Sequence, residues 1–184
     1  MDTSSPALVL VVIAGPQASG KSAISMALAA ELRRRGERVA LVELDQIAAM
    51  ALPTLPSWDA AHQITELVTG RWARAGLTCV ITEGAGTAER VAALLAQTPP
   101  DAVALTVVTT APFEIALARA QADPTRGVSR ESDYLGAVYD RWTSEIARID
   151  SDVVLDTSVL CVEQSVERIR VTMDSARSSR STSR

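Results

Sequence analysis

Apolar runs of strand length alternate along the chain with longer segments in which apolar residues recur every three or four positions. The first run, Ala7 to Ala14, is unbroken, which is typical of a strand buried on both faces. The segment from Ala23 to Arg35 then has Ile24, Leu28 and Leu32 at the spacing of one helix face. The chain therefore opens with a predicted buried strand followed by a predicted helix.

The same alternation continues through most of the sequence. Strands are predicted over residues 7–14, 38–44, 77–82, 102–109 and 153–156. Helices are predicted over residues 23–35, 57–74, 87–97, 112–121, 133–149 and 162–173, with a short helical piece between residues 45 and 52. Strands that alternate with helices need crossover connections, so the sequence predicts an α/β fold: a five-stranded parallel sheet with helices on both faces.

Capping and helix-breaking residues set several of these boundaries. Pro53 and Pro56 end the short helical piece, and Ser57 and Ser132 are predicted N-caps of the helices that follow them. Residues 175–184 are rich in Ser and Arg and show no apolar pattern, which predicts a disordered tail. We therefore expect one domain over residues 1–174.

The loop between the first strand and the first helix fits G-x-x-x-x-G-K-[ST], the pattern that wraps nucleotide phosphates. Its eight residues are Gly15, Pro16, Gln17, Ala18, Ser19, Gly20, Lys21 and Ser22. The glycines allow backbone conformations in which successive N–H groups turn toward one anion, and the helix N-terminus adds partial positive charge. The Lys21 ammonium suits the β- and γ-phosphates, and the Ser22 hydroxyl suits Mg²⁺. The alternative, a glycine-rich turn before an ordinary helix, lacks this convergence of residue types.

Lysine usage supports the same interpretation. The chain has 18 Lys and Arg residues together, and Lys21 is the one lysine among them. A compact ammonium is thus kept at the position where a point charge suits phosphate better than a planar guanidinium does.

The bulk composition is that of a globular protein and excludes some partners. A net charge of −4 argues against a surface that coats nucleic acid. No apolar run reaches the roughly 20 residues that span a bilayer, and the N-terminus lacks the basic region of a secretion signal. Cys79 and Cys161 are too few for a disulfide framework and are expected as small apolar residues. We expect a cytoplasmic protein with no nucleic-acid or membrane partner.

Two acidic residues stand where predicted strands end. Asp45 follows the second strand, and Glu83 follows the third. In parallel sheets ligands bind beyond the carboxyl ends of the strands, so both carboxylates are expected near the phosphate-binding loop. The alternatives are that Asp45 is only a helix N-cap and that Glu83 is only a solvated carboxylate at a strand end.

These features together resemble P-loop small-molecule kinases of the nucleoside-monophosphate-kinase-like group, which includes shikimate, gluconate and adenylylsulfate kinases and chloramphenicol phosphotransferase. The resemblance covers residues 7–173, and the segment Val154-Leu155-Asp156-Thr157-Ser158 followed by a helix is also similar to the close of chloramphenicol phosphotransferase. It implies a three-layer P-loop NTPase fold with a mobile lid, here at about residues 122–131. It also implies ATP and Mg²⁺ as cofactors, and homodimers are frequent in the group.

The resemblance also assigns roles to individual residues. It implies that Asp45 activates the acceptor hydroxyl and that Glu83 holds a Mg²⁺-bound water or contacts the acceptor, although the group more often has Asp at that place. Arg119 is expected to stack on adenine. Arg126 and Arg130 are the lid arginines expected to reach the transferred phosphate, where guanidinium groups stabilise developing charge. The loop that contains Thr157 and Ser158 is expected to border the adenine.

The acceptor site is expected between the lid and residues 47–74. In that segment Trp58 is expected as a partly buried core residue rather than a ring-stacking one, and His62 is a weaker candidate base. The predicted function is ATP-dependent transfer of a γ-phosphate to a hydroxyl of a small molecule: a metabolite, a nucleoside-like compound or an antibiotic, in resistance or biosynthesis. The alternatives are a nucleotide kinase that uses Arg71 and Arg74, or an ATPase or GTPase switch without a small acceptor.

Overall fold

The computed structural model describes residues 7–182. Residues 1–6, to which the prediction about a secretion signal refers, and residues 183–184 of the predicted tail lie outside that range. One sheet of five parallel strands forms the centre of the molecule, in the order β2-β3-β1-β4-β5. The strands are β1 Val9–Ala14, β2 Val39–Glu43, β3 Cys79–Ala85, β4 Val103–Thr110 and β5 Val153–Asp156. This confirms the predicted α/β class, strand number and parallel pairing.

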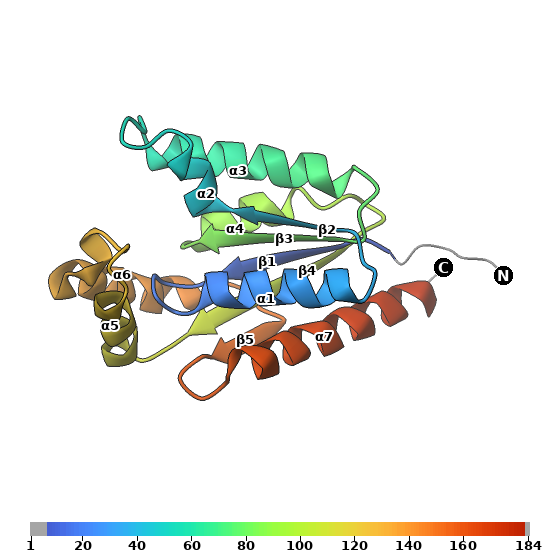
Figure 1. The fold of residues 1–184 in the computed structure, drawn as a ribbon. Helices are drawn as coiled ribbons and strands as arrows, with labels where there is room; N and C mark the ends of the chain where they lie inside the picture. Colours follow the sequence, from blue (N-terminus) through green and yellow to red (C-terminus); the bar gives the residue numbers. More distant parts are fainter. Residues whose placement is uncertain (1–6, 183–184) are drawn as a thin grey trace.

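Helices cover both faces of the sheet, because each inner strand is apolar on both sides (Figure 1). The helices are α1 Lys21–Arg34, α2 Leu44–Ala49, α3 Trp58–Ala73, α4 Ala88–Leu95, α5 Phe113–Ala122, α6 Ser132–Ile146 and α7 Val162–Thr182, with a 3₁₀ turn η1 at Val128–Arg130. One core cluster joins alternate strand residues such as Val11 and Ile81 to α1 and α7. The other joins residues such as Val12 and Val80 to α3, α4 and α6. The sheet is therefore the middle of three layers.

Most predicted boundaries hold, and two capping predictions have different outcomes. The Ser57 side chain accepts a hydrogen bond from the Ala60 N–H and caps α3 as predicted. Ser132 does not cap α6: the helix begins at Ser132 itself, and Glu131 occupies the N-cap position without a side-chain cap bond. The residues of η1 lead directly into α6, so the chain enters the helix one position earlier than the sequence indicates.

The prediction of a disordered tail from residue 175 is wrong for the described residues. The last helix, α7, continues to Thr182 instead of ending at Met173. Arg177 donates to the carbonyls of Ala7 and Thr78 and forms an ion pair with Glu37, at an Nη2–Oε2 distance of 2.7 Å. Tertiary contacts of the arginines, rather than an apolar stripe, thus hold this part of the helix in place.

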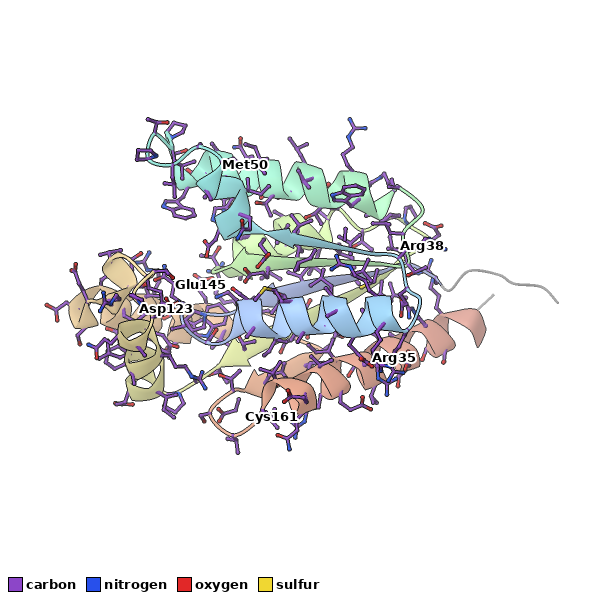
Figure 2. The ribbon with its side chains drawn as sticks, viewed as in Figure 1. Arg35, Arg38, Met50, Asp123, Glu145 and Cys161 are labelled. Carbon is purple, nitrogen blue, oxygen red and sulfur yellow. The ribbon has the colours of Figure 1, made fainter. Side chains whose placement is uncertain are left out.

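The two ends of the sheet present different chemistry. Figure 2 shows Asp123, in the segment after α5, at the end where the strands finish, whereas Arg35 and Arg38 lie at the opposite end. None of the described helices has the length and apolar character that a bilayer span requires. The residues predicted to act on nucleotide are at the carboxyl end of the strands, as parallel-sheet proteins place their ligands.

Candidate functional site

The loop between β1 and α1 has the backbone geometry of an anion site. Gly20 adopts a left-handed φ of 93°, which favours glycine, and Ala18 adopts a φ of 60°. Gly15 lies so close to β4 that a Cβ there would come within 2.2 Å of the Thr109 Oγ1. Since α1 begins at Lys21, its unpaired N–H groups face the same space as the loop amides.

Two buried hydroxyl groups hold this loop in shape. The Ser19 hydroxyl lies 2.8 Å from the Pro16 carbonyl and 2.7 Å from the Thr109 hydroxyl, and Thr109 in turn donates to the Ala14 carbonyl. Both side chains are fully buried. Such a closed network keeps backbone amides aimed at a ligand without reorganisation when it binds.

Lys21 lies over the loop. Its ammonium donates to the carbonyls of Gly15 and Pro16 at 2.9 and 2.8 Å. Desolvation lowers the pKa of Lys21, while the negative charges of Glu83 and Asp45 oppose that shift. The ammonium thus lies on the phosphate-binding loop, within reach of the charges of Glu83 and Asp45, and from there it could contact terminal phosphates.

Glu83 and Ser22 meet beside the ammonium. The Ser22 hydroxyl donates to the Glu83 Oε1 at 3.2 Å, and Glu83 is only 2% exposed. Burial raises the pKa of Glu83; the charge of Lys21 opposes the rise, and Asp45 and Glu43 add to it. The pairing brings together the two residues predicted as a metal site, and their hard oxygen atoms fit Mg²⁺. Within residues 7–182 no group of three or more His, Cys, Asp or Glu side chains could hold a metal, so phosphate and water oxygens would complete the coordination.

Asp45 joins the same group from β2 and α2. It lies in the first turn of α2, and the N-cap position is taken by Glu43, so the N-cap interpretation of Asp45 is wrong. Its charge acts on Lys21, on Glu83 and on Glu43, whose pKa is raised by burial and by Asp45. The cross-strand register places Glu43 opposite Glu83, which explains how acidic groups of two strands converge.

The two arginines of the predicted lid, Arg126 and Arg130, make different contacts. Arg126 forms an ion pair with Asp123, at an Nε–Oδ2 distance of 3.2 Å, and its charge also lowers the pKa of Lys21. Arg126 thus lies near enough to the phosphate-binding loop for its charge to act on Lys21. Arg130 donates to the Gln121 carbonyl at 3.4 Å, and both arginines line an open hollow beside η1. In this conformation Arg130 makes no contact with the phosphate-binding loop among its described hydrogen bonds.

Arg119 and Thr157 connect three segments around the phosphate-binding loop, and the expected stacking of Arg119 on adenine stays a prediction. Arg119 donates to the Thr157 hydroxyl at 2.9 Å and to its carbonyl at 2.6 Å. The same hydroxyl lies 3.0 Å from the Ser19 carbonyl, so α5, the loop after β5 and the phosphate-binding loop are tied together. The Ser158 hydroxyl donates to the Asp156 carboxylate. The polar groups of Thr157 and Ser158 are therefore engaged within the protein, and a nucleotide base at this position would meet the loop surface.

Two tyrosines of α6 also reach the phosphate-binding loop, and no motif in the sequence marks them. The Tyr139 hydroxyl donates to the Gln17 carbonyl at 3.3 Å, and the Gln17 amide lies 3.4 Å from the Tyr134 hydroxyl. Burial raises the pKa of Tyr139 to about 12, although the charges of Arg119 and Arg126 oppose the rise. Helix α6, which follows the segment predicted as a lid, is thus in direct contact with the loop that would bind phosphates.

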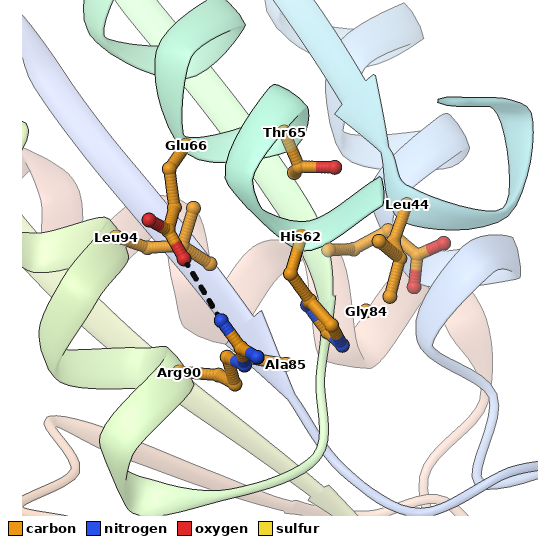
Figure 3. A pocket seen from close by; sticks show the side chains of 9 residues that line it. Leu44, His62, Thr65, Glu66, Gly84, Ala85, Arg90 and Leu94 are labelled. Atoms are coloured by element: carbon orange, nitrogen blue, oxygen red, sulfur yellow. Dashed lines mark hydrogen bonds and ion pairs between the residues drawn. The ribbon is translucent and has the colours of Figure 1, made fainter. Parts of the chain in front are cut away.

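A small cavity beside Glu83 brings together His62, a weaker candidate from the sequence, and residues that the sequence did not single out. Figure 3 shows His62 and Glu66 of α3 and Arg90 of α4 around this cavity. Arg90 forms ion pairs with Glu66, at 3.5 Å, and with Asp59. Burial, and then the charge of Arg90, lowers the pKa of His62, which keeps its imidazole neutral at neutral pH. In the sequence, the seven-residue spacing that places Asp59 and Glu66 on one face of the helix was the signal that could have pointed to these ion pairs.

Other candidates of the acceptor segment lie elsewhere. Arg71 is in the last turn of α3, and Arg74 donates to the carbonyls of Gly70 and Gln97, at the end of α3 remote from Trp58. Neither is brought to the phosphate-binding loop. Trp58 is 53% exposed, so the expectation of a core tryptophan is wrong.

No protein-family model matches this sequence, and no match is found among curated proteins. Several solved structures share its fold. A sugar kinase from a Janibacter species is 22% identical, with 93% of this chain and 97% of that chain covered and a TM-score of 0.59. Shikimate kinase from Bacteroides thetaiotaomicron is 14% identical, with 90% of this chain and 98% of that chain covered and a TM-score of 0.66. Shikimate kinase from Aquifex aeolicus is 15% identical, with 90% of this chain and 96% of that chain covered and a TM-score of 0.53. At these identities the similarity shows the α/β fold of the chain.

Proposed function

We propose that this chain is an ATP- and Mg²⁺-dependent kinase that transfers the γ-phosphoryl group to a hydroxyl of a small molecule. The observation that carries the proposal is the meeting of Lys21, Ser22 and Glu83 at the phosphate-binding loop, with Asp45 beside them. The kinases that share the fold support it. The acceptor classes to be considered are hydroxylated metabolites, nucleoside-like compounds and antibiotics.

The residues would divide the work of phosphoryl transfer. Loop amides and Lys21 would hold the β- and γ-phosphates, and Ser22 and Glu83 would hold Mg²⁺, which supplies charge neutralisation on the phosphate oxygens. The acceptor hydroxyl oxygen forms a bond to the γ-phosphorus as the bond from that phosphorus to the β–γ bridging oxygen breaks. The hydroxyl proton passes to the Asp45 carboxylate, and Arg126 stabilises charge on the transferred group.

The two alternatives fit the structure less well. A nucleotide kinase needs cations around the phosphate of its acceptor, and Arg71 and Arg74 lie at the wrong end of α3 to provide them. A switch ATPase or GTPase needs no acceptor pocket, whereas acidic groups converge here beside the ammonium.

Labelled ATP offered with a panel of hydroxylated small molecules tests the proposal. We expect label in an acceptor-dependent product, with slow hydrolysis when no acceptor is present. Rapid hydrolysis that no acceptor changes would support a switch, and transfer only to nucleoside monophosphates would support a nucleotide kinase.

A further inference from the structure

Trp58 stands out on the surface because of where its helix places it. The chain has three tryptophans, and Trp142 is buried in the core. Trp58 precedes Ala61 and Thr65 by three and seven positions, so it continues the stripe of α3 that faces inward. Ala61 and Thr65 are 1% and 2% exposed, but Trp58 is 53% exposed. The inward-facing stripe therefore extends one turn past the residues that cover it.

A series of residues leads from this turn toward the phosphate-binding loop. Ser22 donates to Glu83, and Glu83 lines the same small cavity as His62. His62 lies four positions after Trp58, so the two side chains are neighbours on one helix face. Side chains of helices lean toward the N-terminus, which carries the indole further beyond the ends of the strands. In Figure 1 the start of α3 lies at the same end of the sheet as α5 and α6.

The charges along this line disfavour an anionic ligand next to the indole. Of the described residues that line the cavity, Arg90 is the one cation at neutral pH, and Asp59 and Glu66 of α3 already pair with it. Glu43, Asp45 and Glu83 add negative charge toward the loop. A phosphate or carboxylate at this wall would face carboxylates without an unpaired cation.

We propose that Trp58 is a specificity-determining residue that stacks on the acceptor, and that the acceptor is a hydroxylated compound presenting a flat or apolar ring face without an anionic group there. The inference rests on the proposed kinase function. Indole faces bind aromatic rings and the apolar faces of sugar rings alike, because both offer area without requiring hydrogen bonds. Both ring types therefore belong in the test.

The experiment compares Trp58→Ala and Trp58→Phe with Trp72→Ala in acceptor-dependent phosphoryl transfer. Trp72 is the matched control, a 46% exposed tryptophan at the other end of the same helix. The acceptors are uncharged aromatic nucleosides, uncharged cyclic sugars, their phosphorylated forms and open-chain polyols. Loss of a stacking contact corresponds to roughly a 5- to 150-fold rise in the KM of a ring acceptor in Trp58→Ala, since removal of uniform binding acts on KM. Trp58→Phe should restore most of the affinity, and Trp72→Ala should match the wild type.

Binding provides a readout that does not depend on turnover. In a Trp72→Phe background, saturating ring acceptor with Mg²⁺-ADP should change the tryptophan emission, and additional replacement of Trp58 by Phe should abolish that change. Equal kinetic effects of Trp58→Ala and Trp72→Ala, or better transfer to open-chain or phosphorylated acceptors, would overturn the inference while leaving the kinase function intact. Absence of transfer to every acceptor, without an emission change, would contradict both.

Discussion

The two ends of the same sheet use positive charge in opposite ways. At the amino end, Arg177 donates to the carbonyls of Ala7 and Thr78, and Arg180 donates to those of Pro100 and Ala102. Each of these guanidinium groups donates hydrogen bonds to carbonyls of the protein itself. At the carboxyl end, the Lys21 ammonium sits among loop carbonyls and partly desolvated carboxylates whose charges perturb one another.

This contrast separates a structural from a functional cation. Arg177 and Arg180 direct their guanidinium groups to carbonyls and a carboxylate of the protein itself, whereas the carboxyl end leaves loop amides available and carries shifted pKa values at Lys21 and Glu83, which are common at functional sites. The amino end should therefore govern stability and the carboxyl end activity. Variants at each end can break or sharpen that division.

Lys21→Ala should have the largest effect. The variant removes the one ammonium from the phosphate site, and we expect acceptor-dependent transfer from ATP to fall by about 10³-fold, near the upper range for loss of one preorganised electrostatic group. Steady-state assays with labelled ATP measure the loss, and thermal unfolding provides the control, since the fold should remain. Full activity in this variant would contradict the assignment of activity to the carboxyl end of the sheet.

Asp45→Asn should follow, with a loss of about 10²-fold or more, because a neutral amide cannot take the acceptor proton. The variant keeps the size of the side chain, so Mg²⁺-ATP should still bind. Measuring kcat together with nucleotide affinity separates the two steps. An unchanged kcat would show that another group, with Glu83 as the candidate, accepts the proton.

Arg177→Ala should affect the other property. The side chains of Arg177 and Glu37 are 14% and 15% exposed, and loss of one partner of a buried pair costs about 3 kcal/mol. We expect a lower free energy of unfolding with kcat retained in the protein that remains folded. Arg170→Ala is the matched control, because the carboxylates that Arg170 pairs with are more than half exposed and such pairs contribute below about 1 kcal/mol. Equal destabilisation by both variants would contradict the assigned role of Arg177.

Glu83→Gln should give a small shift in stability, and the sign of that shift is informative. Burial raises the pKa of Glu83 above the usual 4.5, so the folded chain keeps this proton to a higher pH than the unfolded chain does. Above pH 4.5 and through the raised pKa, the folded state binds more protons, and the contribution of Glu83 to stability falls as pH rises. Glu83→Gln removes that penalty.

Thermal unfolding at several pH values measures the difference. The Gln variant should have the higher Tm at pH 7 and a smaller dependence of Tm on pH, and it should lose Mg²⁺-dependent transfer. A lower Tm than the wild type at pH 7 would show that the Glu83 carboxylate stabilises the fold rather than serving the site at a cost in stability.

The sequence predicted those features that depend on residues close together in the chain. The unbroken run before Gly15, the glycine and lysine positions of the loop, and the carboxylates after two strands all depend on short-range sequence, and the structure brings them together. The ion pairs of Arg90 with Asp59 and Glu66, by contrast, depend on side chains from α3 and α4 that meet only in the folded protein.

The remaining differences have the same cause. The helical conformation of residues 175–182 depends on contacts that Arg177 and Arg180 make with strand ends far away in sequence. The exposure of Trp58 depends on how far α3 extends past the sheet, which apolar periodicity alone does not reveal. Tertiary packing, not propensity, decides such features.

Calorimetric titration of Mg²⁺-ADP into the wild type, Lys21→Ala and Arg177→Ala, at a temperature where all three are folded, tests the division between the two ends most directly. We predict saturable one-site binding to the wild type and to Arg177→Ala with similar affinity, and binding at least about tenfold weaker to Lys21→Ala, since loss of a charged contact exceeds 1.4 kcal/mol. No binding to the wild type, or equal affinity of Lys21→Ala, would contradict a nucleotide site at the carboxyl end of the sheet.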